Sequence, residues 1–129
     1  MQYQEFVDRV RQRTTQDDER SAEILTEVTL ATLGERLYRT ERDHLAAQLP
    51  AELRAFLTER SKPETTRMQT EGFTIQEFYN RVSERANLDY QTSKDWSQAV
   101  IDVLKQAVTP GTIEEVRDSL PAEFGGLFQ

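Results

Sequence analysis

The chain has 129 residues and a mass of 15.0 kDa, which is the size of one ordinary domain. It contains no cysteine, so disulfides, thiolate metal sites and cysteine nucleophiles are excluded. Its net charge of −7 comes from 23 acidic and 16 basic residues, and no basic run is present. Because nucleic-acid-binding domains normally carry a basic face, we expect no binding to nucleic acid.

The sequence also lacks the features of a membrane protein. No stretch is apolar over the ~18 residues that a membrane-spanning helix needs. The first ten residues, MQYQEFVDRV, are polar and amphipathic, unlike the charged head and apolar stretch of a signal peptide. We therefore expect a cytoplasmic protein that makes no contact with membranes.

Two segments with the same helical pattern stand 72 positions apart. YQEFVDRVRQR at residues 3–13 and IQEFYNRVSER at residues 75–85 each place apolar residues at i, i+3, i+4 and i+7. This spacing forms one face of an amphipathic helix. In the second copy, Thr74 and Glu77 form a capping-box pattern, so a helix is predicted to begin there.

A longer helical pattern follows in each half, now 71 positions apart. It covers about residues 18–37 and 89–108. Leu30 and Ile101 widen the apolar stripes, so we expect both helices to be buried on more than one side. The stripe of the second copy includes Trp96, and such a stripe is more often core than the lining of a small-molecule pocket. We expect Trp96 to lie in the core.

Each half then closes with two short helices that meet at a Leu-Pro corner. TERDHLAAQL and TIEEVRDSL each begin with a threonine and carry an acid three residues later, again a capping-box pattern. The phrases QLPAEL and SLPAEF follow. Pro50 and Pro121 suit the first turn of a helix, and a proline biases the residue before it away from helical geometry.

The sequence thus predicts an all-α protein, since no segment shows the period-two alternation of a strand. Repeat one covers about residues 3–57, a polar linker about 58–72 and repeat two about 73–128. Duplicated units of this size usually pack their apolar faces on one another. We therefore expect two tandem four-helix repeats, packed as one pseudo-two-fold helical domain over residues 1–129.

Two stretches of the sequence resemble a known family. LATLGERLYRTERDHLAAQLPAEL at residues 30–53 looks like the signature of a bacterial family catalogued as domain of unknown function 2267. VLKQAVTPGTIEEVRDSLPAEF at residues 103–124 is similar to that family's companion repeat. The resemblance covers nearly the whole chain and implies an all-helical bacterial protein. It implies no activity, because the family has no established one, and no functional residue is carried over from it.

Carboxylates and a single histidine are the candidates for a metal site. Glu41 and His44 have the Glu-x-x-His spacing of di-iron bundles, but such a site needs two of these motifs. Glu19, Glu23 and Glu27 recur at every fourth position. Acids at a helix start favour the helix dipole, with a hard divalent cation as the alternative. Since charge runs are usually solvated faces, we predict no metal and no cofactor.

The sequence contains no set of residues that is typical of catalysis. His44 is its only histidine, and neither a G-x-S-x-G motif nor a phosphate-binding glycine loop is present. A helix-turn-helix at the Leu-Pro corners is disfavoured, because PAEFGGLFQ at residues 121–129 carries no basic residue to contact bases. We therefore predict no catalytic residues and favour a protein that is not an enzyme.

The last short helix of each half supplies the positive argument about function. Phe56, Phe124, Leu127 and Phe128 give these helices apolar edges, and a partly exposed apolar edge marks a protein–protein surface. We expect a non-enzymatic interaction module that binds a protein partner or a second copy of itself. The alternatives are a small-ligand or metal-binding protein that uses the helix carboxylates, and a DNA-binding regulator, which the acidic charge disfavours.

Overall fold

The computed structural model describes residues 1–59 and 72–129. Within these two ranges all regular structure is helical and no strand is present, which confirms the all-α prediction. In the same ranges, no helix combines the length and the apolar character that a bilayer-crossing helix needs. Most of the linker predicted at about residues 58–72 lies outside the described residues.

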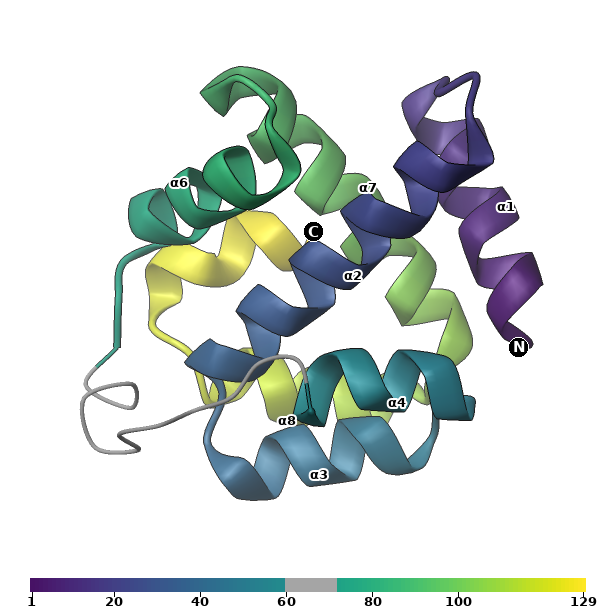
Figure 1. The fold of residues 1–129 in the computed structure, drawn as a ribbon. Helices are drawn as coiled ribbons and strands as arrows, with labels where there is room; N and C mark the ends of the chain where they lie inside the picture. Colours follow the sequence, from purple (N-terminus) through teal and green to yellow (C-terminus); the bar gives the residue numbers. More distant parts are fainter. Residues whose placement is uncertain (60–71) are drawn as a thin grey trace.

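The helices follow one another in two sets of similar lengths (Figure 1). The first set consists of α1 (Tyr3–Thr14), α2 (Glu19–Arg36), α3 (Arg39–Ala47) and α4 (Ala51–Thr58). The second consists of α6 (Ile75–Ala86), α7 (Tyr90–Ala107), α8 (Pro110–Asp118) and a closing 3₁₀ helix, η1 (Ala122–Phe128). The lengths are 12, 18, 9 and 8 residues in the first set and 12, 18, 9 and 7 in the second.

The two long helices begin at capping aspartates. The carboxylates of Asp18 and Asp89 accept hydrogen bonds of 3.0 and 2.8 Å from backbone N–H groups in the first turn of α2 and α7. These bonds satisfy donors that have no partner within the helix. The long segments predicted at about residues 18–37 and 89–108 are therefore confirmed as helices, each with an aspartate as its N-cap. Thr74 likewise caps α6, because its hydroxyl oxygen accepts a 3.1 Å hydrogen bond from the N–H of Glu77.

The third helix of each set begins earlier than predicted. α3 starts at Arg39 without a side-chain cap, and α8 starts at Pro110 with Thr109 as its cap. Thr40 and Thr112 consequently lie inside the helices, so the capping boxes predicted from them are wrong. In α8 the reason is Pro110, which has no N–H to lose and is therefore favoured at the first helical position.

Both Leu-Pro corners turn the chain as predicted. Pro50 and Pro121 stand immediately before α4 and η1, with ψ angles of 162° and 154°. They therefore occupy the capping position, one residue before the first turn in which they were expected. The leucines that precede them, Leu49 and Leu120, are buried, so each corner is held on the core.

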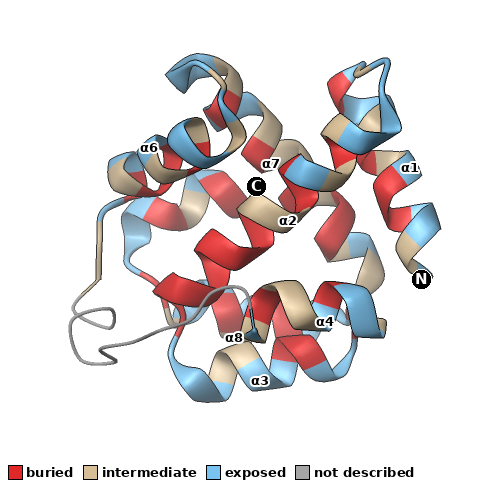
Figure 2. Cartoon of the chain, in the orientation of Figure 1, coloured by how far each residue is buried: buried red, intermediate tan, exposed pale blue. Residues whose placement is uncertain are grey.

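The long helices α2 and α7 form the centre of the molecule. α2 contacts α1, α4, α6 and α7, and α7 contacts α1, α2, α6 and η1. Figure 2 shows that buried positions concentrate on α2 and on the inner faces of the helices around it. Buried residues from both sets belong to one hydrophobic cluster, so neither set has a separate core.

The closing 3₁₀ helix belongs to this core. Phe124, Leu127 and Phe128 expose only 0%, 1% and 2% of their surface. The ring of Phe124 meets that of Phe78 edge to face at 6.3 Å, and η1 packs on α7. The prediction that these three residues form a partner surface is therefore wrong. Their apolar edge is covered by a helix of the same chain.

Replacing Phe124 with alanine should lower the free energy of unfolding by about 3–5 kcal/mol, because the change empties a fully buried ring site. Urea unfolding followed by tryptophan fluorescence measures this. The control is Glu123→Ala, an exposed neighbour, which should change the free energy by no more than about 0.5 kcal/mol. An unchanged unfolding midpoint for Phe124→Ala would contradict the placement of η1 in the core.

Candidate binding groove

Two loops with the same backbone turn lie at one end of the molecule (Figure 1). Thr15 and Asn87 follow the last residues of α1 and α6 as their C-caps, and both adopt the left-handed conformation, with φ of 51° and 58°. This conformation is uncommon for residues other than glycine and is typical of helix C-termini. Each loop then leads within three residues to the aspartate that caps the following long helix.

A groove of about 480 Å³ lies between these two loops. We call it the loop groove. Its apolar lining comes from α2, α7, the end of α6 and the loop that follows it, and its polar lining comes from both loops and from the first turn of α2. The apolar residues are Ile24, Leu25, Ala86, Leu88 and Trp96, and the polar ones are Thr15, Gln16, Asp17, Asp18, Ser21 and Asn87.

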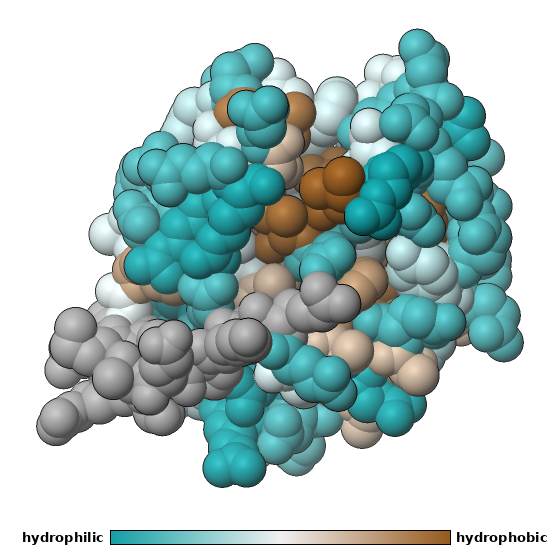
Figure 3. Space-filling model, in the orientation of Figure 1, coloured by the Kyte–Doolittle hydropathy of each residue, from teal (hydrophilic) through white to brown (hydrophobic). Residues whose placement is uncertain are grey.

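The apolar floor of the loop groove continues from the core into solvent. Leu25 is buried, Leu88 and Trp96 are only partly buried, and Ile24 exposes 37% of its surface. Figure 3 shows hydrophobic atoms in a hollow between α6 and the region of α1 and α2. Trp96 therefore packs against the core, where we expected it, but lies at the edge of the core and also lines a groove.

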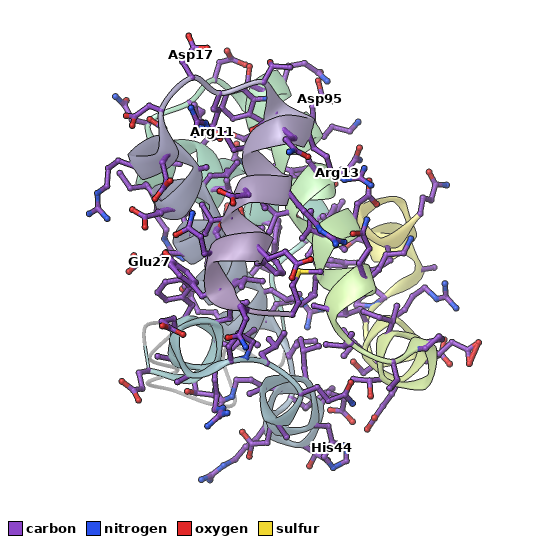
Figure 4. The ribbon with its side chains drawn as sticks, turned by 90° about the vertical axis from the view of Figure 1, so that its right-hand side faces the viewer. Arg11, Arg13, Asp17, Glu27, His44 and Asp95 are labelled. Carbon is purple, nitrogen blue, oxygen red and sulfur yellow. The ribbon has the colours of Figure 1, made fainter. Side chains whose placement is uncertain are left out.

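The polar side of the groove is acidic. Within residues 1–59 and 72–129, its lining includes two carboxylates and no basic side chain. Asp18 is occupied as the helix cap and also accepts a hydrogen bond from the hydroxyl of Ser21 at 3.2 Å. The side chain of Arg11, on α1, donates hydrogen bonds to the backbone carbonyls of Gln16 at 3.2 Å and Asp17 at 2.6 Å. The loop that carries Asp17 is thereby fixed to α1 (Figure 4).

The candidate metal ligands named from the sequence are not brought together. Within residues 1–59 and 72–129, no group of three or more acidic or histidine side chains is placed to hold a metal ion. His44 contacts Glu115 on the facing helix α8, with 2.8 Å between Nδ1 and Oε2, rather than Glu41 on its own helix. Figure 4 shows His44 at the opposite end of the molecule from Asp17.

The carboxylates along α2 interact with the start of α1. The hydroxyl of Tyr3 donates to Glu23 at 3.4 Å, and its ring packs edge to face on Phe56 at 6.1 Å. Burial, followed by the charges of Glu23 and Glu27, raises the pKa of Tyr3 to about 12. Glu19 is exposed. Phe56 of the predicted partner surface is thus partly covered by Tyr3 of the same chain.

Sequence reasoning missed a cluster of charges between α2 and α6. Glu35 exposes only 8% of its surface and accepts hydrogen bonds from Arg85 at 2.6 and 3.2 Å and from Arg81 at 3.1 Å. Arg85 also donates to the hydroxyl of Thr32 at 3.0 Å. A signal was present in the sequence. Glu35 lies in LGERL at residues 33–37, which we call the L-G-E-R-L motif, and both arginines lie in the helical segment IQEFYNRVSER at residues 75–85.

Arg36, the next residue of that motif, is also buried, exposing 5% of its surface. Its Nε donates to the carbonyl of Phe73 at 2.9 Å, and its guanidinium lies 5.1 Å from the ring centre of Phe124, a cation–π geometry. Burial lowers its pKa. Gly72 has a φ of 78°, and a Cβ there would collide with this guanidinium. The motif therefore ties α2 to the start of the second set of helices.

One protein-family model matches the sequence over residues 3–127, and its description is "Uncharacterized conserved protein (DUF2267)". No curated protein matches the sequence. The matched range includes every residue that lines the loop groove and all members of the cluster around Glu35. The match itself assigns no role to either feature.

Replacing Glu35 with alanine should lower the free energy of unfolding by about 2–3 kcal/mol, because Arg85 loses its counter-charge and Arg81 keeps only its ion pair with Glu77. This is less than the cost of breaking a fully buried pair, since the arginines are partly exposed. Glu84→Ala removes an exposed acid of α6 and serves as the control. Equal unfolding midpoints for the two variants would contradict a stabilising role for Glu35.

The raised pKa of Tyr3 predicts a loss of stability at high pH. The phenol of the unfolded chain loses its proton near pH 10.0, whereas that of the folded chain keeps it until about pH 12. The folded state thus binds more protons between these values, and its stability falls as the pH rises from 10 to 12. Tyr3→Phe should flatten this part of a stability–pH curve measured by urea unfolding. An equally steep curve for the variant would contradict the assignment.

Proposed function

Because the chain belongs to the DUF2267 family, whose description names no activity, we propose its function from the loop groove. We propose that the protein is a non-enzymatic, cytoplasmic interaction module that binds a segment of a partner protein in this groove. The observation that carries the proposal is the partly exposed apolar floor formed by Ile24, Leu88 and Trp96.

The energetics of the floor favour association. Covering apolar surface stabilises a complex by roughly 25 cal/mol for each Å² removed from water, and aromatic and aliphatic anchors in pockets usually dominate binding energy. Ile24 and Trp96 lie on α2 and α7, the two central helices. A groove that is built on packed helices is formed in advance, so a partner orders little of it on binding.

The shape of the apolar surface favours a chain segment over a small ligand. The groove volume of about 480 Å³ lies within the range of small-molecule pockets, so a small ligand is the second candidate. However, Val28 is partly buried one turn along α2 from Ile24, on the same face of the helix. The apolar strip therefore extends beyond the groove, and a helix or loop of a partner covers more of it.

We also infer that residues 3–57 and 73–128 are two repeats related by an approximate two-fold axis within one domain. The helix contacts support this: α1 with α7 corresponds to α6 with α2, and α2 with α4 corresponds to α7 with η1. Polar pairs correspond as well. Arg81 binds Glu35, and at the aligned positions Arg9 binds Gln106. The loop groove lies between corresponding loops, so both repeats contribute to it.

A display library of segments from the proteins of the same organism tests the proposed function. Segments selected by the wild-type protein should bind Ile24→Asp at least about tenfold more weakly, because a charge replaces an exposed apolar anchor. The matched control is Tyr38→Asp, which alters a 48% exposed hydrophobic residue outside the groove and should leave binding unchanged. Circular dichroism verifies that both variants fold.

Two outcomes contradict the proposal. In one, the library yields no segment that binds the wild-type protein. In the other, the selected segments bind Ile24→Asp as tightly as the wild type, so that their site lies elsewhere on the surface.

A further inference from the structure

We propose that the segment bound in the loop groove is a basic amphipathic helix, with an apolar anchor on the groove floor and lysine or arginine side chains beside Asp17 and Asp18. This inference rests on the proposed function and specifies the chemistry of the partner. It follows from the charges around the groove, from their distance to Ile24 and from the helical nature of the site.

The carboxylate of Asp17 is available to a partner. It is exposed, and within the described ranges its side chain makes no hydrogen bond or ion pair, whereas its backbone carbonyl is bound by Arg11. Asp18 contributes a second negative charge at the same wall while it caps α2. Among the described residues no basic side chain lines the groove, so this lining offers a cation two carboxylates without a competing charge.

Two basic residues close to this wall make contacts within the chain. Arg20 forms an ion pair with Glu23 at 3.5 Å, whereas Arg11 donates to two neutral backbone carbonyls of the loop and keeps its positive charge outside the groove lining. On the opposite side, Asp89 follows Leu88, and hydrogen bonds from Thr92 hold its pKa below the usual value. The chain as a whole carries a net charge of −7, which attracts a basic segment from a distance.

The geometry sets the pattern of the partner. Asp18 caps α2 six residues before Ile24, which corresponds to roughly 9 Å along the helix axis, and Asp17 stands in the loop just before this cap. A partner helix that runs along α2 covers this distance in about six residues, so its basic residues should stand six or seven positions from its apolar anchor. The described residues offer no strand edge, so pairing by strand addition has no template, and the apolar strip along α2 from Ile24 to Val28 favours the helix-in-groove mode.

Three synthetic helical peptides of equal length test the inference. They share the same leucine anchors, lack tryptophan, and carry lysine, glutamine or glutamate at the flanking positions. Trp96 is the only tryptophan of the chain and lines the groove, so its emission reports occupancy. The lysine peptide should bind about fivefold tighter than the glutamine peptide at low salt, with the glutamate peptide weakest. Added salt should reduce the difference.

A double variant locates the charge effect. Asp17→Asn with Asp18→Asn removes both charges and keeps the cap of α2, because asparagine caps as well as aspartate. It should weaken the lysine peptide by about fivefold and leave the glutamine peptide unchanged. The matched control, Glu114→Gln with Asp118→Asn, removes two exposed acids of α8 and should not change the binding of either peptide.

The outcomes separate this inference from the function on which it rests. Equal binding of the lysine and glutamine peptides, or an equal loss in the control variant, overturns the basic partner. The proposed function then stands if Ile24→Asp abolishes binding. Failure of all three peptides to change Trp96 emission also overturns the inference, and the selection of natural segments then decides the proposed function independently.

Discussion

The structure depends on the burial of α2. Eight consecutive residues, from Thr29 to Arg36, are all buried in this helix, so its C-terminal half has no face for water. Such a helix is stable only when other elements surround it, and α1, α4, α6 and α7 do so. The cover ends towards the N-terminal half, where Ile24 is exposed. The loop groove is the place where α2 is left uncovered.

Burial on all sides also imposes an electrostatic condition. α2 ends in Glu35 and Arg36, and a charge that is removed from water costs free energy unless it is paired. Arg81 and Arg85 form ion pairs with Glu35. Arg36 donates a hydrogen bond to the carbonyl of Phe73 and makes cation–π contacts with the rings of Phe73 and Phe124. The L-G-E-R-L motif is therefore explained by the packing of α2 against α6, and it is not evidence of a ligand site.

The sequence predicts features that depend on neighbouring residues better than features that depend on contacts between distant segments. The long helices, the cap at Thr74 and the Leu-Pro corners depend on residues within one or two turns of each other, and they were predicted with errors of one residue at most. The exposure of a single apolar side chain depends on helices far away in the sequence. Phe124 was predicted at the surface and lies in the core, whereas Trp96, predicted in the core, lies at its edge and also lines a groove.

The same distinction explains why the groove escaped sequence reasoning. Its two sides come from loops 71 or 72 positions apart in the sequence. The residues that differ between the two similar segments shape the groove more than the residues that they share. Ile24 aligns with Asp95, and Asp17 aligns with Leu88, so one copy exposes an apolar residue where the other exposes a charge. A strictly repeated sequence would present two identical sides and accept a segment in either direction. With acids on one side and Leu88 on the other, the two sides of the groove differ, so the proposed partner helix has one preferred direction.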